Sequence, residues 1–322
     1  MHALVTGGAG FIGHHLVRAL LDRGDTVAVI DDFSTGFPER LAPFAGQIEL
    51  VEGDVRDPAA LDRAARGCEI VFHQAGLPSV SRSIREPRQS NEVNASGTIE
   101  LMLAAARNGV HRVVFAASSS VYGDSPEFPR RETQSPRPLS PYATSKLAAE
   151  FYLHNLGELH GVETVALRYF NVFGPGQDPA SEYSAAIPRF ITAGLSGERP
   201  VVYGDGTQSR DFTYVDNVIS ANLLAASAAA VSGLTCNIGC GKQHSLLDLL
   251  TAIGREVGRD MKPLFEPGRA GDVLYSRADI SLAQRRLGYS VVVPFEEGVT
   301  RCVAAYREAL RTGSAASNRP QT

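Results

Sequence analysis

Short apolar segments alternate with segments of helical spacing through the first half of this chain, and this alternation most restricts how it can fold. HALVTG, TVAVIDD, IELVEGDV and EIVFHQAG are strand-like, and FIGHHLVRALLDRG between the first two has the spacing of an amphipathic helix. Strands and helices in alternation predict a doubly wound parallel sheet, an α/β fold. The pattern continues to TVALRYFN, and we expect seven strands before residue 172.

The second half of the chain has a different character. Glycine and proline become denser beyond residue 173, in GPGQDP, GLSGERP and YGDGTQ, and the regular alternation gives way to short elements. The length of 322 residues suits about two domains. We predict a first domain over residues 1–172 with a returning segment near 211–235, a smaller mixed α/β domain over 173–310 interleaved with it, and a disordered tail over 311–322.

The charge balance and the cysteines exclude several classes of protein. Lys and Arg number 31 and Asp and Glu 35, and this net charge of −4 argues against binding to nucleic acid. Four cysteines are too few for a disulfide framework, and Cys236 and Cys240 lack a second pair at zinc spacing. The chain has neither a long apolar run nor a basic leader. We expect no metal, no membrane span and a cytoplasmic location.

A glycine-rich turn stands between the first strand and the first helix. ALVTGGAGFIG places Gly7, Gly10 and Gly13 where they allow a tight turn, a close approach to a pyrophosphate and close packing of helix on strand. The next strand ends at Asp31 and Asp32, where a carboxylate binds ribose hydroxyls and repels a 2′-phosphate. This combination predicts a dinucleotide site that favours NAD over NADP.

A third acidic residue, Asp54, ends another strand in the motif GDV. Two interpretations fit this position equally well. The carboxylate contacts the adenine of the dinucleotide, or it caps the helix that follows.

Tyr142 and Lys146 in PYATSK stand four residues apart, just after Pro141. Both therefore project from one face of a predicted helix. An ammonium near a phenol lowers the pKa of the phenol, which lets the tyrosine act as a general base. The pattern alone is typical of an exposed helix face. It gains weight only because the glycine-rich turn precedes it.

The motifs TGGAGFIG, SSSVYG, YATSK, RYFNVFGPGQ, GDGTQSRDFTYVDN and RAGDV follow in this order over nearly the whole chain. In this series the chain resembles the extended short-chain dehydrogenases/reductases, and within them the NAD-dependent epimerase/dehydratase family and its UDP-sugar 4-epimerases. The resemblance implies a Rossmann domain that binds NAD and a C-terminal domain that binds a UDP- or dTDP-sugar. It also implies a homodimer that packs through the helices near Val93–Asn108 and Tyr142–Leu159.

The resemblance assigns further positions to the cofactor site. Asn94 and Thr98 support the nicotinamide side, and His73 is a buried supporting histidine and not a metal ligand. The predicted cofactor-binding residues are Gly7, Gly10, Phe11, Ile12, Gly13, Asp31, Asp32, Ser34, Thr35, Gly36, Asp54, Val55, Gln74, Ala75, Gly76, Asn94, Ala116, Tyr142, Lys146 and Tyr169.

The residues before VYG separate the reactions of this family. Relatives that dehydrate the sugar carry an Asp-Glu pair there, and decarboxylating relatives keep a Glu. This chain has Ser118, Ser119 and Ser120, which leaves a simple return of hydride, that is, 4-epimerisation. Ser118 corresponds to the hydroxyl that binds O4 of the sugar. The alternatives are a 4-keto-sugar reductase or dehydratase of the same family, and a non-catalytic regulator that senses NAD.

The resemblance also implies the contacts to the nucleotide. Arg210 and Arg269 clamp the two phosphates, because guanidinium groups suit phosphate oxygens. Tyr203 packs on uracil, and Asp272 binds the ribose or orients Arg269. The predicted substrate-binding residues are Pro78, Ser79, Val80, Arg82, Ser118, Ser119, Ser120, Tyr142, Phe170, Asn171, Arg189, Val201, Tyr203, Arg210, Arg269, Asp272 and Ser276.

The identity of the sugar stays open between a hexose, an N-acetylhexosamine and a hexuronate. Ser276 stands where relatives restricted to hexoses carry a tyrosine, and a small residue there leaves room for an N-acetyl group. For a uronate, hydroxyls at Ser119 and Ser120 face the C5 carboxylate, and Arg82 or Arg189 is the candidate counter-charge.

One departure argues against the uronate. Some glucuronate epimerases have Thr and Arg where this chain has Asn171 and Asp178.

Overall fold

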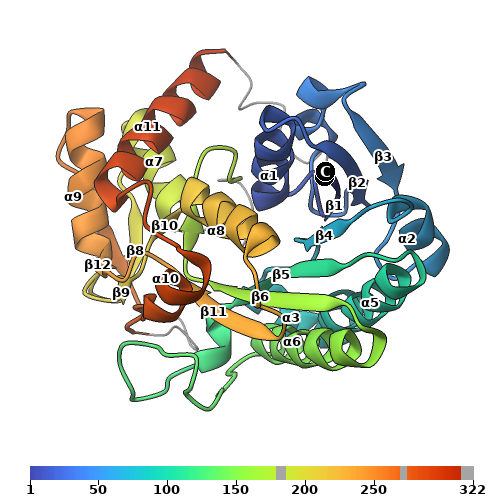
Figure 1. Cartoon of the computed structure of the whole chain (residues 1–322). Coiled ribbons are helices and arrows are strands. Elements are labelled where there is room, and N and C mark those ends of the chain that lie inside the picture. The colour runs from blue at the N-terminus through green and yellow to red at the C-terminus, as the bar shows by residue number, and fades with distance from the viewer. Residues whose placement is uncertain (179–185, 269–273, 313–322) are drawn as a thin grey trace.

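A parallel sheet of seven strands forms the centre of the first region (Figure 1). The computed structural model describes residues 1–178, 186–268 and 274–312. The strands are rich in Val, Ile and Ala because both faces of the sheet are covered by helices. In spatial order they are β11 (Leu234–Ile238), β6 (Glu163–Tyr169), β5 (Arg112–Ser118), β4 (Ile70–His73), β1 (His2–Thr6), β2 (Thr26–Asp31) and β3 (Ile48–Glu52).

Helices cover the two faces of this sheet. One face packs against α1 (Phe11–Asp22) and α8 (Val215–Ser227), and the other against α2 (Pro58–Ala64), α5 (Gly97–Arg107) and α6 (Pro141–His160). The predicted α/β fold with a doubly wound Rossmann sheet is confirmed. The strand order reverses between β1 and β4, and ligands bind at the carboxyl ends of strands at such a point.

The prediction of seven strands before residue 172 is wrong. Residues 1–171, all of which are described, form six strands of the sheet, and the seventh is β11 (Leu234–Ile238). It pairs with β6 in parallel, with Leu234 opposite Val165. Helix α8 precedes β11 and packs on β5 and β6, so the chain returns to the sheet after it has begun the second region.

The second region consists of three helices that pack on one another and three small sheets of two strands each within the described residues. Its helices are α7 (Ala186–Ser196), α9 (Leu246–Val257) and α11 (Phe295–Arg311). The paired strands are β7 (Val172–Phe173) with β10 (Thr213–Tyr214), β9 (Ser209–Arg210) with β12 (His244–Ser245), and β8 (Val201–Tyr203) with β13 (Leu264–Glu266).

Shorter helices join these elements, and α10 returns to pack on β11. They are η1 (Pro38–Arg40), η2 (Ala42–Phe44), α3 (Val80–Arg85), α4 (Pro87–Asn91), the π-helix η3 (Glu92–Ser96), η4 (Ser119–Tyr122) and α10 (Ser281–Leu287).

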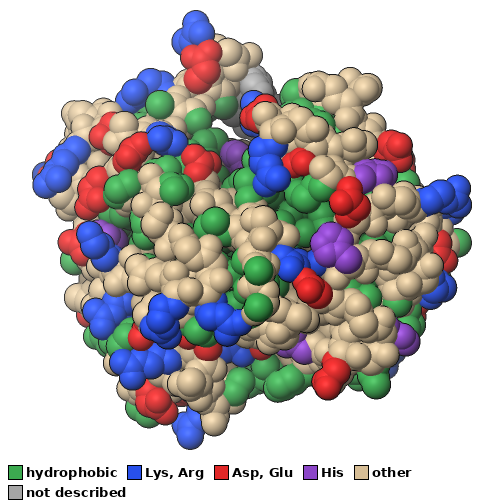
Figure 2. All heavy atoms as spheres, viewed as in Figure 1, with side chains coloured by type: hydrophobic (Ala, Val, Ile, Leu, Met, Phe, Trp, Pro, Cys, Tyr) green, Lys and Arg blue, Asp and Glu red, His purple; other side chains and the backbone are tan. Residues whose placement is uncertain are grey.

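Basic and acidic side chains are interspersed on the face that Figure 2 shows. Among the described residues, no helix combines the length and the apolar character that a membrane crossing requires.

Helix α11 extends to Arg311, the first residue of the predicted disordered tail, and Thr312 caps it. Residues 313–322 lie outside the described residues.

A buried ion pair joins α6 to β6. Arg168 donates from Nε to Glu150 Oε2 at 3.0 Å and from a terminal nitrogen to Oε1 at 2.6 Å. The two side chains are only 6% and 4% exposed. A third donation, at 2.9 Å, reaches the hydroxyl of Tyr122. Because every charged atom here is taken out of water, removing one partner leaves the other charge buried and uncompensated.

We expect Arg168→Met to lower the free energy of unfolding by roughly 3–5 kcal/mol, because it leaves the Glu150 carboxylate buried without a compensating positive charge. Urea denaturation followed by circular dichroism measures the loss. The matched control is Arg107→Met, which breaks the exposed pair of Arg107 with Asp62. That change is expected to cost less than about 1 kcal/mol. Equal losses in the two variants would contradict this account of the buried pair.

Candidate active site

The glycine-rich turn between β1 and α1 has no space for side chains. Gly7 has a φ of +68°, and a Cβ on it would lie 2.8 Å from backbone atoms of Ala75. A Cβ on Gly13 would lie 2.0 Å from the carbonyl oxygen of Gly7. Helix α1 begins after Gly10 without a side-chain cap, so the first N–H groups of the helix remain available for an anion. The turn therefore fits a pyrophosphate.

A pocket lies beside this turn at the carboxyl ends of β1, β2 and β4. Most of its lining was predicted from the sequence as cofactor-binding. Ile30, Gly53, Leu77 and Val93 were missed, because an apolar or glycine residue carries no chemical signal beyond its place next to a predicted one. The lining residues are Gly7, Gly10, Ile30, Asp31, Asp32, Ser34, Thr35, Gly36, Gly53, Val55, Gln74, Ala75, Gly76, Leu77 and Val93.

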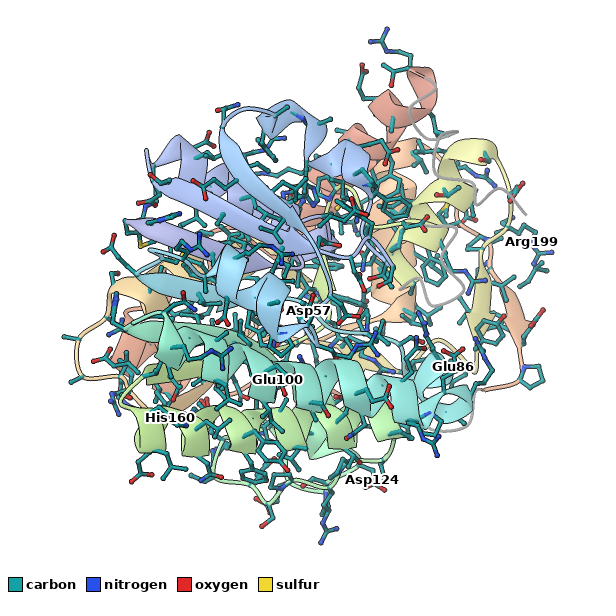
Figure 3. The ribbon with its side chains drawn as sticks, turned by 90° about the vertical axis from the view of Figure 1, so that its right-hand side faces the viewer. Asp57, Glu86, Glu100, Asp124, His160 and Arg199 are labelled. Carbon is teal, nitrogen blue, oxygen red and sulfur yellow. The ribbon has the colours of Figure 1, made fainter. Side chains whose placement is uncertain are left out.

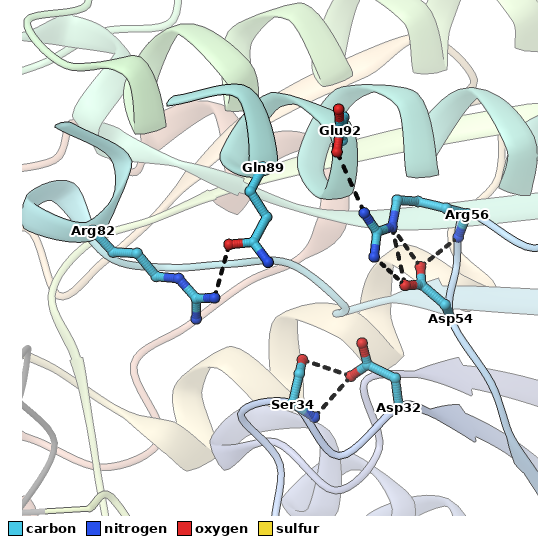
Figure 4. Close-up of polar contacts among 7 residues, drawn as sticks. All are labelled: Asp32, Ser34, Asp54, Arg56, Arg82, Gln89 and Glu92. Atoms are coloured by element: carbon cyan, nitrogen blue, oxygen red, sulfur yellow. Dashed lines mark hydrogen bonds and ion pairs between the residues drawn. The ribbon is translucent and has the colours of Figure 1, made fainter. Parts of the chain in front are cut away.

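The two acidic residues at the end of β2 hold the pocket wall in place. The Asp31 carboxylate accepts the N–H groups of Ala9 and Phe33 at 2.8 and 2.9 Å. Burial raises the pKa of Asp31, and these two hydrogen bonds oppose that rise. Asp32 accepts both the N–H and the hydroxyl of Ser34 (Figure 4). Asp31 thus joins the glycine-rich turn to the strand that follows it.

Asp54 is not among the residues that line the pocket. Its carboxylate binds the side chain of Arg56, which also reaches Glu92 at 3.5 Å (Figure 4). The alternative that Asp54 caps the next helix is wrong, because Asp57 is the N-cap of α2 and accepts the N–H of Ala59. The Asp54–Arg56 ion pair lowers the pKa of Asp54.

Several predicted cofactor residues lie next to the pocket but do not line it. Tyr169 accepts from Gln74 at 3.2 Å and from Asn222 of α8 at 2.8 Å, and Gln74 also donates to Asn222. Asn222, fully buried, was missed by the sequence analysis. In the sequence, Asn222 stands out only as a polar residue within an apolar helix. Phe11 and Ile12 pack against the core, Gly13 lies under the turn, and Ala116 is nearly buried in β5.

Asn94 and the nearby Thr98 belong to a network of internal hydrogen bonds. Asn94 lies in the π-helix η3, where its side chain binds the backbone of Leu77 and the hydroxyl of Ser145. π-Helical turns are frequent at functional sites. Thr98 donates to the Asn94 carbonyl and also binds His73.

His73 is fixed between two hydroxyls. Its ring nitrogens lie 2.8 Å from Thr6 Oγ1 and 3.0 Å from Thr98 Oγ1. Burial, together with the nearby charge of Lys146, lowers the pKa of His73 to about 3. The imidazole is therefore neutral at physiological pH.

Helix α6 brings the predicted catalytic pair, Tyr142 and Lys146, against the end of β5. The Ser140 hydroxyl accepts the N–H of Ala143, and Pro141 occupies the first turn, so the helix begins just before Tyr142. The side chain of Ser118 lies close to the hydroxyl of Tyr142. Burial raises the pKa of Tyr142, and the interaction with Ser118 opposes the rise.

Lys146 lies one helical turn after Tyr142 and is only 6% exposed. Burial lowers the pKa of Lys146 to about 7, and the charge of Glu150 opposes this change. A Cβ on Gly76, which lines the cofactor pocket, would lie 3.7 Å from Lys146 Nζ. The ammonium therefore stands at the edge of that pocket, and the sequence prediction and the geometry agree on which residues meet there.

The two other serines after β5 lie close by. Ser119 opens η4, and the Ser120 hydroxyl lies 2.8 Å from the hydroxyl of Ser118.

A second pocket lies between the end of β6 and the second region, with a volume of about 260 Å³. It brings together the predicted residues Asn171, Arg189, Val201, Tyr203 and Arg210. The sequence analysis missed the rest. Val172, Phe173, Gln208 and Phe212 stand within the quoted motifs RYFNVFGPGQ and GDGTQSRDFTYVDN, but most of the missed side chains are apolar and carry no chemical signal of their own. The full lining is Asn171, Val172, Phe173, Ala186, Ile187, Arg189, Phe190, Val201, Tyr203, Gln208, Arg210, Phe212 and Leu246.

Asp211 is a further buried residue that the sequence analysis missed, although it stands in the motif SRDFTYVDN. Its carboxylate accepts the N–H groups of Cys240, Gly241 and Ala278 at 2.7, 2.9 and 3.0 Å. Burial raises the pKa of Asp211 to about 6. Through these bonds Asp211 holds two segments, at residues 240–241 and at Ala278, against the strand that carries Arg210.

Other predicted substrate residues lie outside this pocket. Ser79 caps α3, which follows the exposed Pro78 and begins at Val80. Arg82 binds Glu86. It also donates to Gln89 (Figure 4). Phe170 is buried against Val121 and Tyr122, and Ser276 is half-buried with its N–H on Ser209. Arg269 and Asp272 lie outside the described residues.

Known proteins match this chain over nearly its whole length. The chain is 38% identical to UDP-glucose 4-epimerase of Mycolicibacterium smegmatis over 311 residues, which cover 95% of this chain and 99% of that protein. A structure of UDP-glucose 4-epimerase with UDP-glucose from Thermotoga maritima matches with a TM-score of 0.92 and 35% identity, and covers 96% of this chain and 100% of that one.

UDP-N-acetylglucosamine 4-epimerase from Methanobrevibacter ruminantium, in complex with UDP-N-acetylmuramic acid, matches with a TM-score of 0.91 and 39% identity. The match covers 95% of this chain and 98% of that one. The model of the NAD dependent epimerase/dehydratase family matches residues 3–239. The sequence, the fold and these matches together place the chain in the NAD-dependent epimerase/dehydratase family.

Proposed function

We propose that this protein is an NAD-dependent UDP-sugar 4-epimerase that inverts C4 of the sugar through a transient 4-keto intermediate. The observation that carries this proposal is the group of Ser118, Tyr142 and Lys146 beside the cofactor pocket, with only hydroxyls at Ser119 and Ser120. The relatives named as 4-epimerases support it.

The first pocket fits NAD. The turn has no room for a side chain at Gly7 or Gly13 and leads into a helix N-terminus, which suits the pyrophosphate, and Asp31 stands where a ribose would bind. When bound, NAD accepts a hydride from C4 of the sugar and returns it to the opposite face.

The chain's own residues move the proton. Tyr142 takes the proton from O4, and Ser118, within hydrogen-bond reach of Tyr142, helps to relay it. Burial opposes formation of the phenolate, so a nearby positive charge must offset it. Protonated Lys146, one turn along the same helix face, supplies that charge.

The second pocket holds the nucleotide diphosphate. Arg189 and Arg210 provide guanidinium groups for phosphate oxygens, and Tyr203 offers an aromatic face for uracil. Arg269 and Asp272 keep their predicted roles as part of this proposal. No carboxylate stands at Ser119 or Ser120, which argues against the dehydratase alternative.

Among the three candidate sugars, the uronate has the least support in the contacts. Arg82, one candidate counter-charge, is already paired with Glu86 and bound to Gln89. The Ser120 hydroxyl is engaged with Ser118. We therefore favour a neutral sugar, a hexose or an N-acetylhexosamine.

Replacing the base tests the reaction itself. We expect Tyr142→Phe to lower kcat by about 10²-fold or more, because it removes the general base, while NAD stays bound. Chromatographic resolution of the C4 epimers gives the rate, and absorbance of the released nucleotide gives the NAD content. Tyr152→Phe, at a 45% exposed position on the same helix, is the control and should keep its rate. A fully active Tyr142→Phe would rule out this tyrosine as the base.

Cofactor balance tests the competing reductase. An epimerase regenerates its NAD in each turnover, whereas a reductase consumes reduced cofactor in proportion to product. We expect turnover of many substrate equivalents without added cofactor. Product limited to one equivalent per protein would support the reductase instead.

The position of Ser276 tests the sugar specificity. We expect conversion of UDP-N-acetylglucosamine as well as UDP-glucose, because a small side chain leaves room for the acetyl group. Ser276→Tyr should reduce the rate with the acetylated sugar by roughly tenfold or more relative to UDP-glucose. UDP-glucuronate is assayed alongside. Conversion of the uronate alone would overturn the preference for a neutral sugar.

We also propose that two copies pair through α5 and α6, in the cytoplasm. The two helices run side by side along one face of the molecule, with Glu100 on α5 and His160 at the end of α6 (Figure 3). Phe151 and Leu159 of α6 are 58% and 75% exposed, which supports an apolar contact there.

Phe151→Glu is expected to convert the dimer to a monomer, because it places a charge in the apolar contact. Sedimentation velocity measures the mass of each species. Phe265→Glu changes a similarly exposed phenylalanine, on β13, and should remain dimeric. If the wild-type protein sediments as a monomer across the concentration range, the pairing proposal fails.

A further inference from the structure

The ring of Phe115 lies against the ammonium group of Lys146. Lys146 Nζ stands over the ring, 4.2 Å from its centroid. Phe115 is fully buried in β5, three residues before Ser118, on the face of the sheet that α5 and α6 cover. Neither the glycine-rich turn nor the YATSK motif points to this phenylalanine.

The other groups around Lys146 provide limited compensation for its burial. Glu150 lies one turn further along α6, but both of its carboxylate oxygens bind Arg168. His73, whose ring packs 5.4 Å from that of Phe115, is neutral. Tyr142 precedes Lys146 on α6, and the neutral amide of Asn94 approaches from η3 near Gly76. The π face of Phe115 is thus an electron-rich surface in direct contact with the ammonium.

We propose that Phe115 is a positioning residue whose ring keeps Lys146 protonated and aimed at the tyrosine it serves. This inference rests on the proposed role of Lys146 as the partner of Tyr142. The negative face of an aromatic ring attracts a cation, most strongly where water is excluded. The neutral amine gains nothing comparable, so the ring favours the charged form.

Loss of the Phe115 ring should shift the pH dependence of the reaction in one direction. Burial, opposed by the charge of Glu150, brings the pKa of Lys146 to about 7, so its charged and neutral forms are both populated near neutrality. Loss of the ring favours the neutral amine and lowers the pKa further. If the rate needs charged Lys146, the alkaline limb of the pH–rate profile must then move to lower pH. The acidic limb, which is set by Tyr142 and the sugar, changes less.

The experiment replaces Phe115 with phenylalanines that carry one, two or three fluorines, introduced by nonsense suppression into the full-length NAD-bound protein. Fluorine withdraws charge from the ring face with little change of shape, so these proteins should fold. We expect the alkaline limb of the kcat profile with UDP-glucose or UDP-N-acetylglucosamine to move to lower pH stepwise, by on the order of one pH unit in total. Carbon-13 NMR of labelled lysine follows Lys146 directly.

Phe115→Leu removes the π face entirely, and Phe72→Leu is its matched control. Phe72 is also fully buried, on the neighbouring strand β4, but it belongs to the opposite face of the sheet. Both leucine variants lose packing and stability. Only Phe115→Leu is expected to shift the titration of Lys146 and the alkaline limb.

Two outcomes would overturn the inference. A titration of Lys146 that does not change across the fluorinated series removes the ring's role and leaves the proposed epimerase intact. Equal shifts for Phe115→Leu and Phe72→Leu mean that the effect is general loosening. A Lys146 titration that moves while the rate profile does not supports the contact of ring and ammonium, and refutes instead the proposed use of Lys146 in proton removal.

Discussion

The packing of α6 on β5 and β6 is the contact on which the site depends. It buries Lys146 beside Phe115 and holds Glu150 against Arg168, so one helix face carries both the proposed catalytic lysine and a structural ion pair. Without the ion pair, the helix would have an uncompensated charge at its centre. Without the burial, Lys146 would be an ordinary exposed lysine whose charge is screened by water. The proposed catalytic pair and the buried ion pair therefore share one interface.

The parallel sheet determines at which edge the residues of the site come together. Because all strands run the same way, the glycine-rich turn, Asp31, Gln74 and Ser118 all follow carboxyl ends of strands and meet at one edge. Helix α8 reaches the same edge from the opposite face through Asn222. The second pocket begins where β6 ends, at Asn171. The sugar ring is thereby expected between the two pockets, within reach of Tyr142.

The sequence analysis predicted the parts of the site whose chemistry is local. Gly7, Gly13, Tyr142 and Lys146 were recognised because turn geometry and helical spacing act over a few residues. The strand β11 was missed because its pairing with β6 depends on the long return through α8. Asp211, Asn222 and the apolar lining were missed for the same reason, since their partners are distant in sequence. For Asp54 the structure excludes the capping alternative, because Asp57 is the cap, and the contact with adenine stays a prediction. The roles of the site residues stay predictions.

The repeated crossing of the chain between its two regions has a consequence for how such a protein can change over evolution. Helix α8 and strand β11 belong to the sheet, although they lie in the sequence between β9 and α9, and one apolar cluster runs from β2 to α9 and α11. Neither region is a contiguous cassette that recombination could exchange as a unit. The frame of the site can therefore be inherited only as a whole, and changes within it are local ones to side chains and loops.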